Sequence, residues 1–345
     1  MASPMRAVLV PLEIDPVPPA PGCRLRTLGG VSMGTSWSAR TMVPPALDLA
    51  SGAAIRQLLQ EELDQIVAQM SHWDGASLLS HYNRAPAGSW HALPPRFLDV
   101  LDYALEVAAA SGGAYDPFAG ALVNLRGFGP ERRYNQPGFY APASERVQAT
   151  LAARAALAPV FDRAGKRLLQ PGGALLDFSS IAKGYAVDRL AWCLEQHGVR
   201  HYLVEIGGEL RGAGMKPDGQ PWWVTLEGVP GHDNPATVAA LHGLAIATSG
   251  DYRRYFEHGE SGHLRRASHT LDPRTGYPIA NEVASCTVLH PHCMAADALS
   301  TTITVLGFEA GLAFAEQRQL AARLLLRRPG GLEEHTTGAY QAMLQ

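Results

Sequence analysis

Two oxygen-bearing side chains, Asp297 and Thr301, lie four residues apart in a stretch whose apolar pattern predicts a helix over residues 294–306. Side chains at this spacing project from the same face of a helix, so a carboxylate and a hydroxyl would lie side by side. Such hard oxygen ligands suit Mg²⁺, which keeps several waters and shares its coordination with substrate phosphates. The alternative is that Asp297 caps the helix and Thr301 faces its core, and the spacing alone leaves both open.

A second candidate site lies at the start of the best-patterned helix of the chain, expected over residues 179–197. Asp177 precedes this helix, and Lys183 falls in its first turn. Ser179 or Ser180 is expected to cap it. A lysine at this end opposes the helix dipole, which makes sense when a multiply charged anion docks on the exposed backbone N–H groups. The alternative is a solvated lysine on a helix face.

Residues 268–278 are dense in turn-forming and polar residues. His269 is the side chain of this segment whose ordinary pKa suits general-base work near neutral pH. Asp272, three residues later, is a candidate to orient the imidazole ring. The alternative is that His269 is a packed or surface histidine without a chemical role.

Two short motifs of the sequence also resemble those of serine acyl enzymes. Ser180 and Lys183 form an S-x-x-K pair at a helix start, and residues 274–276 resemble the K-T-G element of serine acyl enzymes. No S-x-N element lies between the two, so the set that such enzymes need is incomplete. The sequence also lacks the P-loop, H-E-x-x-H and G-x-S-x-G motifs.

Helices and short strands alternate along the chain. Two further amphipathic helices are expected over residues 53–70 and 94–110. The predicted strands are short: 202–206, 222–226, 245–248 and 322–327. Because these elements interleave without regular βαβ spacing, we expect an α+β fold. Residues 132–143, rich in Pro, Gly and Tyr, are expected to form a long surface insertion.

The composition excludes several classes of protein. A chain of 345 residues that is 46% hydrophobic and 18% charged is typical of a folded globular protein. It has no apolar run of about 18 residues, so no transmembrane segment is expected. The formal net charge of -3 lacks the positive excess that is typical of proteins that bind nucleic acid. Its 4 cysteines form no C-x-x-C pair, which argues against a disulfide framework and a structural zinc site.

The N-terminal residues are Pro-rich, and we expect residues 1–22 to form a flexible arm ahead of a domain over residues 23–345. A short apolar stretch over residues 7–12 is interrupted by Pro11 and is weaker than the apolar region of a signal peptide. As the sequence stands, this favours a cytoplasmic location.

Short motifs spread over residues 25–328 occur in an order that a known family shares. They are Met33-Gly34-Thr35, Met70-Ser71-His72-Trp73, Tyr82-Asn83, Gly113-Ala114-Tyr115-Asp116-Pro117, Leu122-Val123-Asn124, Gly127-Phe128-Gly129, Leu176-Asp177, Ala182-Lys183-Gly184-Tyr185-Ala186-Val187-Asp188, Ile206-Gly207-Gly208-Glu209, the stretches 247–252 and 269–278, and Ala296-Asp297-Ala298-Leu299-Ser300-Thr301. With these motifs the chain resembles the FAD:protein FMN transferase family of the ApbE type, formerly described as thiamine-biosynthesis lipoproteins.

The resemblance implies a fold, an activity and a site. The fold is an α+β, T-fold-like architecture of mixed and antiparallel sheets flanked by helices. The activity is Mg²⁺-dependent transfer of the FMN moiety of FAD to a Ser or Thr hydroxyl of an acceptor flavoprotein, with release of AMP. His269 would be the base, and Mg²⁺ would be held by Asp297, Thr301 and the carbonyl of Ser180. The residues expected to contact FAD are Met33, Trp73, Ala114, Tyr115, Asp116, Asp177, Lys183, Thr270 and Leu271.

Some alternatives remain open at this point. One is Mg²⁺-dependent hydrolysis of FAD to FMN and AMP, and another is a non-catalytic FAD-binding protein, although a binder has no need of a base such as His269. The domain over residues 23–345 is expected to act as one functional unit, either as a single body or as two subdomains with the FAD cleft between them. If the family norm holds, the protein is periplasmic or membrane-associated instead of cytoplasmic.

Overall fold

The computed structural model describes residues 7–48, 51–131, 133–232, 236–258 and 265–345. The chain divides into two compact units, each assembled from separate stretches of the sequence. Unit 1 comprises Met1–Gln65, Ile181–Gly250 and Glu282–Gln345, and unit 2 comprises Ile66–Ser180 and Asp251–Asn281.

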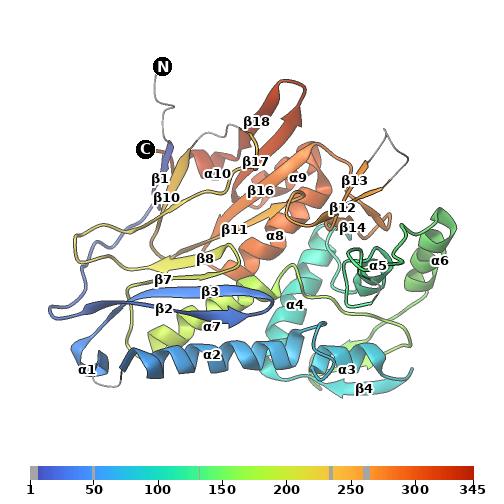
Figure 1. The fold of residues 1–345 in the computed structure, drawn as a ribbon, viewed down its shortest axis with the longest axis horizontal. Helices are drawn as coiled ribbons and strands as arrows, with labels where there is room; N and C mark the ends of the chain where they lie inside the picture. The colour runs from blue at the N-terminus through green and yellow to red at the C-terminus, as the bar shows by residue number, and fades with distance from the viewer. Residues whose placement is uncertain (1–6, 49–50, 132, 233–235, 259–264) are drawn as a thin grey trace. The chain divides into compact units, whose positions relative to one another are not determined.

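Unit 1 is built around an 8-stranded sheet with the order β18-β17-β16-β11-β8-β7-β3-β2 (Figure 1). Every neighbouring pair in this sheet is antiparallel. The strands are β2 (Arg24–Ser32), β3 (Thr35–Val43), β7 (Tyr202–Ile206), β8 (Glu209–Ala213), β11 (Leu244–Gly250), β16 (Val283–His290), β17 (Ala321–Arg328) and β18 (Gly331–Thr336). The central strand β16 is an almost continuous buried run, as a strand covered on both faces requires.

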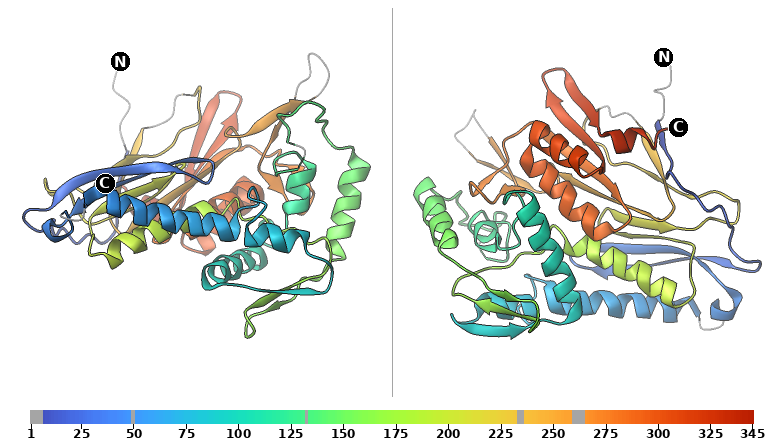
Figure 2. Two further views of the ribbon diagram at one scale, coloured as in Figure 1. Left: turned by 60° about the horizontal axis from the view of Figure 1, so that its bottom comes forward. Right: turned by 180° about the vertical axis from the view of Figure 1, so that it is seen from behind.

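Three helices pack on this sheet: α7 (Ala182–Gln196), α8 (Cys293–Leu306) and α9 (Phe308–Gln317). α7 contacts β7 and β8, α8 contacts β11 and β16, and α9 contacts β17. The view from behind in Figure 2 shows the three helices in front of the sheet. α7 and α8 also contact each other.

Most of α2 (Ser51–Met70) also belongs to unit 1. The indole N–H of Trp37 in β3 donates to the Gln60 side chain of α2 at 2.9 Å. The short helices α1 (Pro45–Asp48) and α10 (Gly338–Gln341) also belong to this unit, as does a 3-stranded sheet with the order β1-β10-β9.

Part of the segment expected to be a flexible arm, residues 1–22, forms a strand, and residues 1–6 lie outside the described residues. β1 (Ala7–Leu9) pairs in parallel with β10 (Thr237–Leu241), which pairs with β9 (Trp222–Thr225). Leu9 is fully buried in an apolar cluster with Trp222. Burial of such a side chain contributes about 1.5–3 kcal/mol to the stability of the fold. The Pro-rich composition of the segment gives no indication of this burial. The flexible-arm expectation is therefore wrong for residues 7–9.

The described residues of unit 2 form the end of α2, four further helices and three small sheets. The helices are α3 (Leu78–Arg84), α4 (Pro95–Ala110), α5 (Gly120–Leu125) and α6 (Ser144–Ala155). One sheet has the order β4-β6-β5, and the other two are the pairs β12-β13 and β14-β15. Their strands are β4 (Ser89–Ala92), β5 (Phe161–Asp162), β6 (Arg167–Gln170), β12 (Tyr255–His258), β13 (Arg265–Ser268), β14 (Leu271–Asp272) and β15 (Tyr277–Pro278).

Aromatic rings anchor the segment that was expected to be a surface insertion. Residues 133–143 form no helix or strand, and Arg132 lies outside the described residues. The ring centroids of Tyr134 and Phe139 lie 5.9 and 5.1 Å, respectively, from the ring centroid of Phe256 in β12. The described part of this segment is therefore held within unit 2 by the contacts of these two rings with β12.

The predicted α+β class is confirmed, with the expected helices over 53–70, 94–110 and 294–306 appearing as α2, α4 and α8. The four predicted strands appear as β7, β9, β11 and β17. No helix in the described part of the chain is long and apolar enough to cross a membrane.

Candidate functional site

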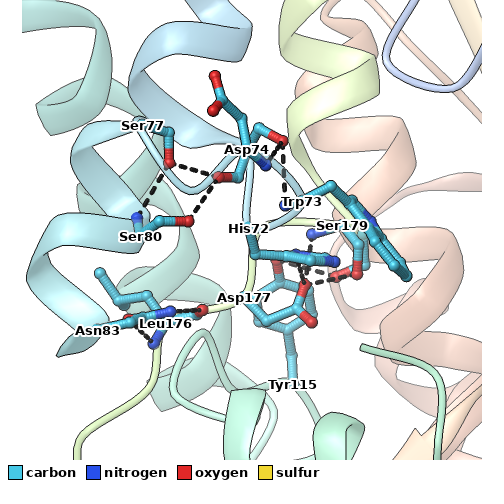
Figure 3. A network of polar contacts seen from close by, with 12 residues as sticks. His72, Trp73, Asp74, Ser77, Ser80, Asn83, Tyr115, Leu176, Asp177 and Ser179 are labelled. Atoms are coloured by element: carbon cyan, nitrogen blue, oxygen red, sulfur yellow. Dashed lines mark hydrogen bonds and ion pairs between the residues drawn. The ribbon is translucent and has the colours of Figure 1, made fainter. Parts of the chain in front are cut away.

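Asp177 lies at the centre of a buried polar network in unit 2 (Figure 3). Its Oδ1 atom accepts hydrogen bonds from the backbone N–H and the hydroxyl of Ser179, at 2.7 and 2.5 Å, and lies 3.5 Å from Nδ1 of His72. Burial alone raises the pKa of this carboxyl, but the charge and hydrogen bond of His72 and the bonds from Ser179 outweigh it and lower the pKa to about 2. Asp177 is therefore an anion at neutral pH.

The helix expected over 179–197 begins later, at Ala182. Its N-cap residue is Ile181, which makes no side-chain cap bond, so the predicted capping by Ser179 or Ser180 is wrong. Ser179 is bonded to Asp177 instead, and the hydroxyl of Ser180 donates to the Tyr115 hydroxyl at 3.3 Å. The Ser179 hydroxyl therefore bonds the Asp177 carboxylate instead of a backbone N–H group at the start of α7.

In unit 1, α8 carries the predicted pair Asp297 and Thr301. Asp297 is 4% exposed, and its Oδ2 accepts the backbone N–H of Gly184 at 3.0 Å. The described residues offer the Oδ1 atom of Asp297 no hydrogen-bond partner. The hydroxyl of Thr301 forms a 2.8 Å hydrogen bond with that of Ser249 in β11. Ser249 is a site residue that the sequence did not single out, because its partner lies on a distant helix.

The position of α8 depends on α7. Asp188 of α7 accepts the backbone N–H groups of Cys293 and Met294, each at 2.9 Å, and so caps the start of α8 from outside. Gly184 allows the two helices to approach, since a Cβ at this position would lie 2.3 Å from the carbonyl oxygen of Cys293. These contacts fix Asp297 relative to the first turn of α7.

The donor set fits a hard cation. No group of three or more His, Cys, Asp or Glu among the described residues could hold a metal ion, so a site rich in nitrogen, sulfur or carboxylate ligands has no support there. Asp297 and Thr301 provide a carboxylate and a hydroxyl one turn apart, which suits Mg²⁺ with waters and substrate phosphate as its other ligands. The N–H of Gly184 donates to Asp297 instead of back to Ser180, four residues earlier. The Ser180 carbonyl is thereby left outside the helical hydrogen bonds.

Lys183 has a protein partner. Its Nζ lies 2.6 Å from Oε1 of Glu209 in β8, and the Glu209 side chain is 2% exposed. The lysine at the start of the helix therefore does not by itself indicate a docked anion, because a buried carboxylate already balances its charge. Glu209 lies in one of the motifs that carry the resemblance, but its pairing with Lys183 could not be predicted from the sequence.

Met33 occupies a conformation that is rare for its residue type. It and Gly34 form the two-residue turn between β2 and β3, with φ values of 52° and 75°. Positive φ at both positions is what a type I′ hairpin turn requires, and Asn-Gly is the usual choice there. A methionine held in this region points to a role for its side chain.

His269 is oriented by a backbone carbonyl. Its Nδ1 lies 3.1 Å from the carbonyl oxygen of Arg254, which also accepts the backbone N–H of His269 at 2.9 Å. Because a carbonyl only accepts, Nδ1 carries the proton, and Nε2 carries the lone pair that a base needs. The expectation that Asp272 orients this ring is wrong, since both oxygens of Asp272 bond the Arg274 guanidinium at 2.9 Å.

The remaining predicted FAD residues all lie in unit 2. Trp73 is 45% exposed, beside the ring of His72 and under the guanidinium of Arg133. Ala114 and Tyr115 are buried. The Asp116 carboxylate accepts the backbone N–H of Phe118 and pairs with Arg154.

Thr270 and Leu271 are also buried. The backbone N–H of Thr270 donates to Ser268, and its carbonyl accepts from Ile279. The FAD contacts expected from the backbone here would therefore compete with existing hydrogen bonds.

The predicted residues thus form two groups. Met33, Lys183, Asp297 and Thr301 belong to unit 1, and the other predicted site residues belong to unit 2. Within unit 1, the first turn of α7 links Lys183 to Asp297 through Gly184. Within unit 2, Asp177 and its neighbour Ser180 are brought to His72 and Tyr115.

Comparison with known proteins decides the family. The profile of the ApbE family matches residues 33–324, most of the chain. This protein belongs to the ApbE family. The FAD:protein FMN transferase of Vibrio cholerae is 35% identical over 331 residues, which cover 92% of each chain. That of Haemophilus influenzae is also 35% identical, over 92% of this chain and 91% of the relative.

Solved structures of ApbE proteins share the fold. The apo form of the Pseudomonas stutzeri flavinyl transferase ApbE has a TM-score of 0.82 and 34% identity, and the match covers 93% of this chain and 97% of that chain. The flavin transferase ApbE from Vibrio cholerae has a TM-score of 0.81 and 32% identity, with coverage of 93% and 99%. The resemblance inferred from the motifs is confirmed, and so is the expected ApbE architecture of sheets flanked by helices.

Proposed function

We propose that this protein is a Mg²⁺-dependent FAD:protein FMN transferase, which moves the FMN moiety of FAD to a Ser or Thr hydroxyl of an acceptor protein. The observation that carries the proposal is a match over about nine-tenths of the chain to relatives named for this activity. The chemically active side chains of the expected site, His269, Lys183, Asp297 and Thr301, are all present in the sequence.

The bond changes are those of a phosphoryl-group substitution. The acceptor hydroxyl oxygen attacks the phosphorus on the FMN side of the diphosphate. The bond from that phosphorus to the bridging oxygen breaks, and AMP leaves with the electron pair. The proton of the attacking hydroxyl passes to Nε2 of His269, the nitrogen left basic by the Nδ1 bond to the carbonyl of Arg254.

Negative charge that develops on the leaving phosphate is stabilised by hydrogen-bond donors. The Lys183 ammonium can donate to that phosphate although Glu209 balances its charge, and the pairing with Glu209 holds Nζ in place before FAD arrives, which reduces the cost of ordering a flexible side chain. Asp297, Thr301 and the carbonyl of Ser180 would hold Mg²⁺. When bound, that ion would neutralise diphosphate charge and polarise the bond that breaks.

The flavin or adenine ring needs a flat apolar surface. Trp73 is a half-exposed indole next to the Asp177 network, and stacking on it suits either ring system. Met33, held at the tip of its turn, is the second apolar candidate.

The test of this assignment is His269→Ala, with His81→Ala as a matched control because His81 is an exposed histidine of α3. Transfer by His269→Ala should fall by about 10²–10⁴-fold, the usual contribution of a positioned base. FAD affinity, measured by fluorescence titration, should stay unchanged in both variants. Transfer at the wild-type rate by His269→Ala would remove the base from the mechanism, and loss of FAD binding would make His269 a cofactor-binding residue instead.

A further inference from the structure

His72, which lies in the turn after α2, has one ring nitrogen satisfied and one not. Its side chain is 9% exposed, and Nδ1 lies 3.5 Å from Oδ1 of Asp177. Nε2 is buried and has no hydrogen-bond partner among the residues that the structure describes. Figure 3 shows the rings of His72 and Trp73 next to each other, on the same side of Asp177 as Ser179.

An unsatisfied buried nitrogen is costly, because folding removes its water without replacing the hydrogen bond. Proteins keep such groups mainly where a ligand or ordered water completes the bond. The neighbouring ring, Trp73, is half exposed, and its centroid lies 5.0 Å from that of His72. A planar ligand stacked on the indole would therefore bring its edge close to the imidazole.

The pairing with Asp177 determines what Nε2 can do. A carboxylate only accepts, so Nδ1 must carry a proton, and Nε2 is then an acceptor in the neutral ring and a donor in the imidazolium. Burial lowers the pKa of His72 and the Arg254 charge adds to this, but the Asp177 carboxylate outweighs both, and the pKa lies above its ordinary value. The Asp177 carboxylate therefore favours the imidazolium more than water would, and in that form Nε2–H is a donor.

We propose that His72 is a further FAD-binding residue, whose Nε2–H donates a hydrogen bond to an acceptor atom on the ring of FAD that stacks on Trp73. The inference rests on the proposed function, since it takes Trp73 and Asp177 as parts of the FAD site. Asp177 acts here as a positioning residue, because it fixes the protonated Nδ1 and supports the positive charge.

Two isosteric substitutions separate this role from a structural one. His72→Asn places an amide N–H where Nδ1 was, so it retains the bond to Asp177 and removes Nε2. His72→Gln can place an amide N–H where Nε2 was. We expect FAD affinity, measured by fluorescence titration, to fall about tenfold or more in His72→Asn, as for loss of a charge-assisted hydrogen bond. His72→Gln should recover most of it.

The pH dependence gives a readout that packing alone would not produce. Wild-type affinity should fall as pH rises through the raised pKa of His72, because Nε2 loses its proton, whereas that of His72→Gln should stay level. The other charged groups near the ring are Asp177, which stays ionised in this range, the guanidinium of Arg254, and that of Arg133 over the Trp73 ring. Thermal melts of both variants check that they fold.

The outcomes are distinct. If the wild type binds FAD and transfers FMN while folded His72→Asn binds FAD equally well, or if the wild-type affinity does not change with pH, His72 only holds Asp177 in place and the inference is wrong. If the wild type neither binds FAD nor transfers FMN, the proposed function itself fails, and this inference with it.

Discussion

Gly184→Ala should be strongly unfavourable although it places a better helix former inside α7. A Cβ at this position would lie 2.3 Å from the carbonyl oxygen of Cys293, 2.7 Å from its carbonyl carbon and 2.8 Å from the Cβ of Asp297. The first two atoms are backbone, so no side-chain rotation relieves the contact. α8 would have to move away from the first turn of α7.

Two opposing effects set the magnitude. Replacing a helical glycine by alanine stabilises by up to about 1 kcal/mol. Overpacking a tight contact costs about 1–3 kcal/mol, and contact with backbone belongs at the upper end of that range. The free energy of unfolding should therefore fall by about 2 kcal/mol. Asp297 moves with α8 and loses its 3.0 Å bond to the N–H of Gly184, so Mg²⁺ affinity should fall as well.

Urea unfolding followed by circular dichroism measures the change in stability. Gly52→Ala in α2 is the matched control, since the nearest atom to its new Cβ would be Cδ2 of Leu28 at 3.5 Å, an ordinary contact. This control should stabilise the protein by up to about 1 kcal/mol. Equal or greater stability of Gly184→Ala relative to the wild type would refute the close packing of α7 on α8.

Three other perturbations follow from the same structure. Asp297→Asn should weaken Mg²⁺ binding strongly and Thr301→Val more mildly, because the hydroxyl carries no charge; calorimetric titration with Mg²⁺ measures both. Leu9→Ala should lower the free energy of unfolding by about 2–5 kcal/mol, because Leu9 is fully buried, and a value near zero in urea unfolding would contradict the pairing of β1. The pKa of Asp177 is about 2, below its unfolded value of about 3.9, so this carboxylate stabilises the fold above pH 4 and that contribution is lost as pH falls toward 2. Unfolding experiments across that range should show a smaller loss for Asp177→Asn than for the wild type.

Periodicity was sufficient for the elements that depend on local pattern. The apolar stripe of α2 and the short run of β7 are local properties of the sequence, and both elements appear where they were expected. β1 could not be predicted in this way, because it exists only through its pairing with β10, more than 200 residues away. Its stabilisation comes from the cluster around Leu9, which no local pattern shows.

In the candidate site, too, local features could be predicted from the sequence and tertiary contacts could not. The sequence spacing correctly placed Asp297 and Thr301 one turn apart on one helix, because the i, i+4 relation is local. Their role as hard-cation ligands stays a prediction. The sequence did not show which polar groups would compete for the same hydrogen-bond partners in the folded protein. Ser179 bonds Asp177 instead of capping α7, and Lys183 bonds Glu209. Asp272 had a nearer partner, Arg274, and so does not orient His269. Each of these outcomes depends on which polar groups tertiary folding brings within reach.

The central claim is that FMN leaves FAD for a protein hydroxyl. The most direct measurement incubates the protein with FAD, Mg²⁺ and a candidate acceptor flavoprotein fragment, and follows the intact mass of the acceptor together with the AMP released. We expect a mass increase equal to one FMN phosphoester, one AMP per modified acceptor, and no increase when the acceptor Ser or Thr is replaced by Ala. Release of AMP and free FMN with an unmodified acceptor would contradict the claim and identify a hydrolase.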